Sequence, residues 1–311
     1  MSSRGGQRVT SAVAYLPAGS EPANLALRPE STVAALPLDG TRVRGVRLAD
    51  GSTIEAGIVV SCAGVFGSPS LLMRSGIGPA DELRGLGIDV LLDLPGVGAN
   101  LADHPGVDLD TGYRGTARTA PLLHTAATFH SSMASDPAPP DLMFWITDPA
   151  PPDDPQATID IVLLKPHSRG SVRLRSADPS DLPRIRLPNL DDERDVDRLV
   201  EGYRRAREAA AELVPGGPFS PDVTLDVADA EALRRMVRGN AYSVPHFAGT
   251  CAMGPSPDDG AVVDSAGRVH GADGLYVVDA SIMPTVPSGF THLPTLMLAE
   301  RLSESIATSL G

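Results

Sequence analysis

The chain has 311 residues, of which 42% are hydrophobic, and its net charge is -13 with a pI near 4.9. This apolar content can bury one large core or two smaller ones, while the acidic balance argues against nucleic acid or an anionic membrane surface as a partner. The sequence has no apolar run of spanning length and no signal-like start, so we expect a cytoplasmic location and no membrane partner.

The first hundred residues predict a small sheet, a strand and a helix. A hairpin is expected at the Asp50-Gly51 pair, which separates two alternating apolar runs. The run 57–64 predicts a fully buried strand, and its small final residues would let the backbone approach a ligand closely. The other elements expected here are the end of a helix over residues 6–16, strands over residues 24–28 and 33–36, and a short helix that follows residue 67.

The middle of the chain differs from the first part in its proline content and in its pattern of polar and apolar residues. Proline-rich loops separate runs of alternating polarity, which indicate half-buried strands, and residues 195–213 have helical periodicity. We interpret this part as an antiparallel-sheet lobe covered by helices. The strands are expected over residues 144–146, 159–164 and 171–175. The predicted domains are residues 1–104, residues 105–238 and a return to the first domain over residues 239–311.

The last part carries two histidines at turns rich in Gly, Ser, Thr and Pro. His246 precedes Gly249-Thr250, and His292 precedes a helix expected over residues 296–308. A helix N-terminus disfavours imidazolium, so His292 should be neutral. The pattern fits a paired-histidine site and two structural histidines equally well. His104, in Leu-Ala-Asp-His-Pro, fits either a ligand contact or a buried turn cap.

Other kinds of site are poorly supported. Cys62 and Cys251 are far apart and belong to no C-x-x-C pattern, which argues against a disulfide framework and against a metal site. A Ser/His/Asp hydrolase is the rival chemistry, but no G-x-S-x-G motif is present. A G-x-G-x-x-G phosphate loop is absent as well, although a complete dinucleotide-binding unit needs one.

Several runs, in order, resemble the glucose-methanol-choline (GMC) family of FAD-dependent oxidoreductases. Two of them read Leu94-Pro-Gly-Val-Gly-Ala-Asn-Leu-Ala-Asp-His104 and His246-Phe-Ala-Gly-Thr250. The full set lies at residues 11–16, 63–79, 94–104, 164–172, 246–254 and 278–285.

The resemblance implies roles for particular residues. His246 matches the base that acts on the substrate hydroxyl, and His292 matches the second group that hydrogen-bonds the same oxygen. Phe290 stands where many relatives carry Asn, so the substrate contacts there are expected to differ. Apart from the resemblance, Phe144 and Trp145 are candidate walls of the substrate cavity. The residues that match the cofactor-lining parts of the family are Val33, Ala63, Gly64, Asn100, Asp279, Ala280 and Pro284.

The implied fold is mixed (α+β or α/β), with an incomplete FAD-binding lobe, made of a β-meander and a parallel-sheet remnant, beside the antiparallel substrate lobe. The implied function is oxidation of a primary or secondary alcohol by proton abstraction and hydride transfer to the flavin N5. Because the phosphate-binding unit of the family is missing here, we expect a truncated product, a mis-called start, or a split enzyme whose Rossmann half is a separate chain. The alternatives are an inactive remnant and a flavin-containing lyase.

Overall fold

The computed structural model describes residues 3–16, 22–114, 124–135, 138–147, 156–188, 190–213, 226 and 228–309. It divides into two compact units, Met1–Thr32 and Val33–Gly311. Among the helices described, none combines the length and apolar content needed to cross a membrane.

The described residues of the first unit form a hairpin and one short helix. β1 (Ser3–Arg4) pairs with β2 (Gln7–Arg8), and α1 (Ser11–Tyr15) follows Thr10, whose hydroxyl caps it by accepting from the Val13 amide. The helix expected over residues 6–16 is thus confined to five residues. The strand expected over residues 24–28 was wrong, because none of the described strands pairs with the backbone groups of this run.

The second unit begins with the predicted meander. β3 (Val33–Ala35), β6 (Gly45–Leu48) and β7 (Thr53–Glu55) form a three-stranded antiparallel sheet, and β4 (Leu38–Asp39) pairs with β5 (Arg42–Val43). The register Val46↔Ile54 confirms the hairpin around the Asp-Gly turn.

A parallel strand pair joins distant parts of the sequence. β8 (Val59–Ser61) pairs with β18 (Leu275–Val277), so the two following turns lie at the same edge. α2 (Gly64–Arg74) begins directly after β8. The expectation of a fully buried strand was wrong, since Val60 is 40% exposed. β18 covers only one edge of β8, and no other described strand pairs with it.

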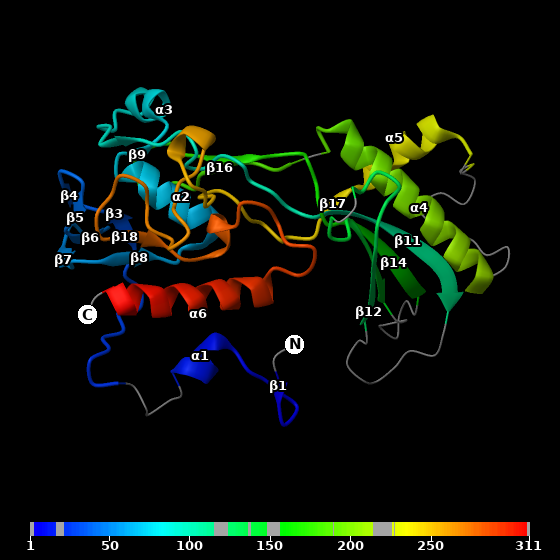
Figure 1. Ribbon diagram of the computed structural model, residues 1–311, viewed down its shortest axis with the longest axis horizontal. Helices are drawn as coiled ribbons and strands as arrows, with labels where there is room; N and C mark the ends of the chain where they lie inside the picture. Colours follow the sequence, from blue (N-terminus) through cyan, green and yellow to red (C-terminus); the bar gives the residue numbers. More distant parts are fainter. Residues whose placement is uncertain are drawn as a thin grey trace. The chain divides into compact units, whose positions relative to one another are not determined.

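The five-stranded antiparallel sheet has the order β12-β13-β14-β11-β17. Its strands are β11 (Pro105–Arg114), β12 (His124–Phe129), β13 (Leu142–Thr147), β14 (Gln156–Leu163) and β17 (Tyr242–Ser243). The helices α4 (Glu193–Leu213) and α5 (Ala230–Asn240) lie along it, as Figure 1 shows. The run expected as a strand at 171–175 forms β15 (Ser171–Arg173), but it pairs with β16 (Arg184–Arg186) in a separate sheet.

Two large hydrophobic clusters and two small ones form within the described residues. The first large cluster unites side chains from residues 36–97 with Leu174 and with others from residues 251–306, and the second is built from residues 107–237 under α4 and α5. The remaining elements of the first large cluster include β9 (Ile77–Gly78), α3 (Ala80–Gly85), β10 (Leu92–Asp93) and α6 (His292–Ser309). Two single turns, η1 (Pro257–Asp259) and η2 (Ala280–Ile282), complete the list of elements. The domain boundaries at residues 104 and 238 stay a prediction.

Candidate functional site

Two antiparallel segments, residues 98–106 and 242–250, run side by side and form the centre of the candidate site. Ala102 and Ala248 exchange both backbone hydrogen bonds, at 2.9 and 3.0 Å, and the Val244 amide donates to the His104 carbonyl at 3.0 Å. At one end of the pairing, Pro105 and Gly106 start β11 against β17. This register, and not sequence proximity, brings His104 against His246.

His246 is held by its backbone and by its ring. Its amide donates to Asp103 Oδ1 at 2.7 Å, and the Ser243 hydroxyl donates to the second oxygen of the same carboxylate. The Nδ1 atoms of His246 and His104 lie 3.0 Å apart, and Nε2 of His104 lies 3.0 Å from the carbonyl oxygen of Pro287. His104 is fully buried, whereas the His246 side chain is half-buried.

The electrostatics favour two neutral rings. Burial, with the neighbouring His246 as a second cause, lowers the pKa of His104 to about 3. Burial also lowers the pKa of His246 from its ordinary value, although the Asp103 carboxylate opposes this change. Burial raises the pKa of Asp103, against the lowering effect of its hydrogen bonds. A neutral imidazole that is partly open to solvent can accept a proton from a bound molecule.

Aromatic rings surround one side of His246. The Phe290 ring lies edge-on to His246 with 5.3 Å between centroids, and Trp145 of β13 lies edge-on to Phe290 at 5.2 Å. The structure therefore brings Phe290 against the predicted base and Trp145 against Phe290. Phe290 keeps 41% of its surface exposed, so this aromatic group is accessible to a ligand.

The structure does not pair His292 with His246. His292 is the first residue of α6, not a residue of the loop before a helix that begins at 296, and its side chain is exposed. Within the described part of the chain it makes no ring contact with His246 and no side-chain hydrogen bond. The histidine in contact with His246 is His104, which the sequence pattern left between two interpretations. No sequence signal fixes the register of the two segments, so this partner could be found only from the fold.

Asp279 joins the two turns at the end of the parallel strand pair. Its Oδ2 accepts from the Gly64 amide at 2.9 Å and from the Ser68 hydroxyl at 2.6 Å. Its Oδ1 accepts from the Ser281 amide at 2.8 Å, which caps η2. Two predicted cofactor residues, Gly64 and Asp279, are thus directly bonded, and Ala280 follows Asp279.

Asn100 joins a second group of predicted cofactor residues. Its Nδ2 donates to the carbonyls of Gly249 and Pro284, at 3.3 and 3.2 Å, and its Oδ1 accepts from Arg169 Nε at 2.8 Å. The Gly249 amide donates to the Ala280 carbonyl at 3.4 Å. Asn100, Ala280 and Pro284 are therefore held together by the turn that follows His246.

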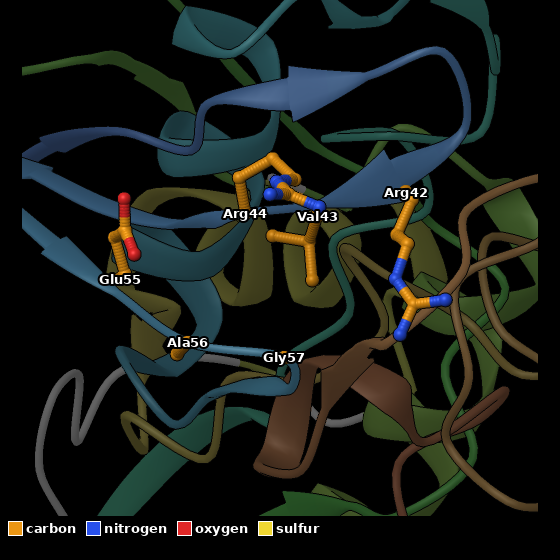
Figure 2. A pocket seen from close by; sticks show the side chains of 6 residues that line it. All are labelled: Arg42, Val43, Arg44, Glu55, Ala56 and Gly57. Carbon is orange, nitrogen blue, oxygen red and sulfur yellow. The ribbon is translucent and has the colours of Figure 1, made fainter.

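Val33 and Ala63 line one shared hollow of about 320 Å³ beside β8, with Val60 and Cys62 among its other walls. At the neighbouring Gly64, φ is +78°, and beyond its own chain neighbours no atom of the described residues lies within 4 Å of the place where a Cβ would stand. The backbone is therefore open to a group that approaches it closely. A different hollow, of about 290 Å³, is lined by Arg42–Arg44 and Glu55–Gly57 and contains none of the predicted site residues (Figure 2). No group of three or more His, Cys, Asp or Glu in the described residues is placed to hold a metal ion.

Two family models for GMC oxidoreductases match the chain, one over residues 1–106 and the other over residues 166–299. The chain is 38% identical over 331 aligned residues to the 5-(hydroxymethyl)furfural oxidase of Methylovorus sp. (strain MP688), covering 98% of this chain and 62% of that protein. It is 33% identical over 346 residues to an oxygen-dependent choline dehydrogenase of Paraburkholderia phymatum, covering 97% and 59%.

Solved structures have the same fold. The crystal structure of pyridoxine 4-oxidase from Mesorbium loti superposes with a TM-score of 0.79 at 31% identity, covering 97% of this chain and 62% of that one. A fungal aryl-alcohol oxidase superposes with a TM-score of 0.76 at 25% identity, covering 90% and 60%. The chain thus spans about three fifths of the length of these relatives. With its mixed α/β fold, it belongs to the GMC oxidoreductase family, a family of FAD-dependent enzymes.

Proposed function

We propose that this chain supplies the catalytic face of an FAD-dependent enzyme that oxidises a primary or secondary alcohol, with His246 as the base. The observation that carries the proposal is the geometry around His246. Its half-exposed ring has Nδ1 at 3.0 Å from Nδ1 of the buried His104 and the Phe290 ring beside it, and burial lowers its pKa, which favours the neutral imidazole. Such a ring can remove the hydroxyl proton of an alcohol that rests against Phe290.

The chain's own residues bind the alcohol, orient it and move its proton. Trp145 and Phe290 would form an apolar surface for its carbon skeleton, which places the hydroxyl at His246. His292, two residues after Phe290, would donate a hydrogen bond to the same oxygen as negative charge develops on it. FAD, when bound, supplies the acceptor for the hydride that leaves the carbon, because no side chain can take it.

The residues that would hold FAD form a connected set and leave room for it. Asp279 fixes Gly64, Asn100 fixes Pro284, and Ala280 lies between these two groups. The hollow lined by Val33 and Ala63 and the open space at Gly64 fit a flat group that approaches the backbone. We assign these residues to an FAD-binding lobe made of residues 1–104 and 239–311, and residues 105–238 to a substrate lobe. The glycine-rich phosphate loop is not among the 311 residues, so we propose that a partner segment or separate chain provides the Rossmann unit.

For the substrate, we favour an alcohol carried by an aromatic or heteroaromatic ring. The edge-on pair of Trp145 and Phe290 beside His246 suits an aromatic ring, because such rings prefer edge-to-face packing. Several relatives have names that indicate substrates of this kind, among them 5-(hydroxymethyl)furfural oxidase, pyridoxine 4-oxidase and aryl-alcohol oxidase. Choline, the substrate named for other relatives, lacks such a ring and serves as the comparison compound.

The test uses two forms of the protein: the chain alone, and the chain fused to a βαβ unit that carries a G-x-G-x-x-G loop. We expect the fused form to purify with a stoichiometric flavin absorbance band and the chain alone to bind FAD weakly or not at all. Under anaerobic conditions, 5-(hydroxymethyl)furfural or benzyl alcohol should bleach the band faster than choline does. A folded, flavin-loaded fusion that no alcohol bleaches would favour a lyase or an inactive remnant. A stoichiometric band on the chain alone would contradict the need for a partner.

A further inference from the structure

We propose that His104 is a positioning residue that fixes the tautomer of His246, so that Nε2 of His246 carries the lone pair that accepts the substrate proton. This inference deepens the proposed function and rests on it for the role of the base. The structural part, namely which nitrogen of His246 carries a proton, can be measured without any turnover.

The Pro287 carbonyl fixes which nitrogen of the His104 ring carries the proton. Nε2 of His104 lies 3.0 Å from the carbonyl oxygen of Pro287, and a carbonyl oxygen can only accept a hydrogen bond. Nε2 of His104 therefore carries a proton. Because the ring is fully buried and neutral, its other nitrogen, Nδ1, carries none.

The tautomer of His104 in turn determines the tautomer of His246. The two Nδ1 atoms are 3.0 Å apart, which is hydrogen-bond distance, and such a contact needs one donor and one acceptor. Since Nδ1 of His104 is the acceptor, Nδ1 of His246 must be the donor. The neutral ring of His246 then has an unprotonated Nε2, for which the described residues provide no hydrogen-bond partner.

The loop that carries the Pro287 carbonyl is held by a second hydrogen bond. The Val286 carbonyl accepts from Nζ of Lys165, the only lysine of the sequence, at 2.6 Å. This contact and the His104–Pro287 contact hold the loop that leads to Phe290. The charged groups that face the pair are the Asp103 carboxylate on the same segment as His104 and the Lys165 ammonium from the loop after β14, and the Leu164 carbonyl also faces the His104 ring. Lys165 lowers the pKa of His104, which supports its neutral form.

The direct test measures the wild-type chain. With histidine labelled with 15N, long-range 15N–1H correlation spectra distinguish a protonated ring nitrogen from an unprotonated one, and a His246→Asn sample identifies the His246 signals. We expect an Nδ1–H, unprotonated Nε2 form of His246 at neutral pH, and the opposite form for His104. A proton on Nε2 of His246, or a charged His246 ring at pH 7, would overturn the proposal and leave alcohol oxidation through another base possible.

Two matched variants distinguish control of the His246 tautomer by His104 from the contribution of His104 to holding the Pro287 loop. His104→Asn keeps an acceptor near the Nδ1 position but loses the donor to Pro287. His104→Gln keeps a donor near the Nε2 position but loses the acceptor for His246. We expect His246 to keep its tautomer in the Asn variant and to lose it in the Gln variant. In the flavin-loaded fusion, the Gln variant should slow flavin reduction by about tenfold or more relative to the Asn variant, the direction known for bases held in the wrong tautomer.

Circular dichroism and the thermal midpoint report whether each variant folds. If both variants change the His246 tautomer equally, or if the Asn variant is the slower one, the role of His104 is structural and the proposal fails. The wild-type spectrum decides the assignment even where a variant does not fold. If His246 has the Nδ1–H tautomer but the protein oxidises no alcohol, the proposed function fails, whereas the role of His104 in fixing this tautomer stands.

Discussion

The two histidines marked by the sequence occupy opposite environments. His246 lies in the paired segments (residues 98–106 and 242–250), where its amide, its ring and its neighbours are all bonded. His292 lies at the helix entrance (residues 288–293), exposed and without a side-chain hydrogen bond in the described part of the chain. Two histidines beside similar turns thus differ in exposure and in hydrogen bonding. The reason is that only His246 belongs to a segment whose backbone is hydrogen-bonded to a second segment. A base needs a fixed orientation, and the paired segments provide it.

The largest effect is expected for the base itself. His246→Ala in the flavin-loaded fusion should slow flavin reduction by an alcohol about 10²–10⁴-fold, the usual contribution of a general base. Rapid mixing under anaerobic conditions measures this rate. His270→Ala is the control, because the His270 ring hydrogen-bonds to the Gly254 carbonyl, which is not one of the predicted site residues. Equal rates for the two variants would remove His246 from the mechanism.

Gly249 of the paired segments and Gly289 of the helix entrance test how much room each region has for a side chain. At Gly249, φ is +95° and a Cβ would lie 2.5 Å from the Asn100 carbonyl oxygen, whereas no atom lies within 4 Å of a Cβ at Gly289. Gly249→Ala should lower the free energy of unfolding by about 1–3 kcal/mol from the backbone conformation alone. Gly289→Ala should change it by less than about 0.5 kcal/mol. Urea denaturation measures both, and similar losses would show that the paired segments are no more restrictive than the helix entrance.

The pH response of His246 tests its surroundings. Its pKa lies below the ordinary value of 6.5 because of burial, and the Asp103 carboxylate acts in the raising direction. The neutral ring is the base, so reactivity is present above this pKa and is lost as the pH falls through it. Asp103→Asn keeps an oxygen for the His246 amide but removes the charge. The pKa of His246 should therefore fall further, and the acidic limb should move to lower pH.

An NMR titration of His246 measures this shift on the chain without FAD, with His270 as an internal reference. An upward movement of the His246 pKa in Asp103→Asn would contradict the assigned cause. In that case hydrogen bonding, not the carboxylate charge, would control the ring.

The smallest effect is expected at the helix entrance. His292→Ala removes an exposed side chain that hydrogen-bonds to none of the residues the structure describes, so the free energy of unfolding should stay within about 0.5 kcal/mol of wild type. His104→Ala, by contrast, leaves the Pro287 carbonyl and the His246 ring without their partner and should cost about 2 kcal/mol or more. Thermal denaturation of the two variants compares them directly. A destabilised His292→Ala would mean that this residue also has a structural role.

The sequence predicted much of the fold where local signals were strong. The Asp50-Gly51 hairpin is present because its turn type and its alternating runs specify it together. The helix expected over residues 195–213 is present as α4 because its apolar stripe faces the sheet. The strand expected over residues 24–28 failed because an apolar run becomes a strand only where another strand pairs with it. β8 was expected to be fully buried, but Val60 is exposed. The burial of a strand depends on the elements packed against it, and the sequence of the strand alone does not identify them.

For the candidate site, the sequence by itself determined the residue types and the family: a histidine before Gly249-Thr250, an aromatic at 290, and the motifs of GMC oxidoreductases. Only the tertiary structure decided which groups meet. It placed His104 against His246, Phe290 beside Trp145, and Asp279 between two turns more than 200 positions apart in the sequence. The physical reason is that a strand's register is fixed by backbone hydrogen bonds and core packing across the whole unit. A motif records only the residues on its own segment.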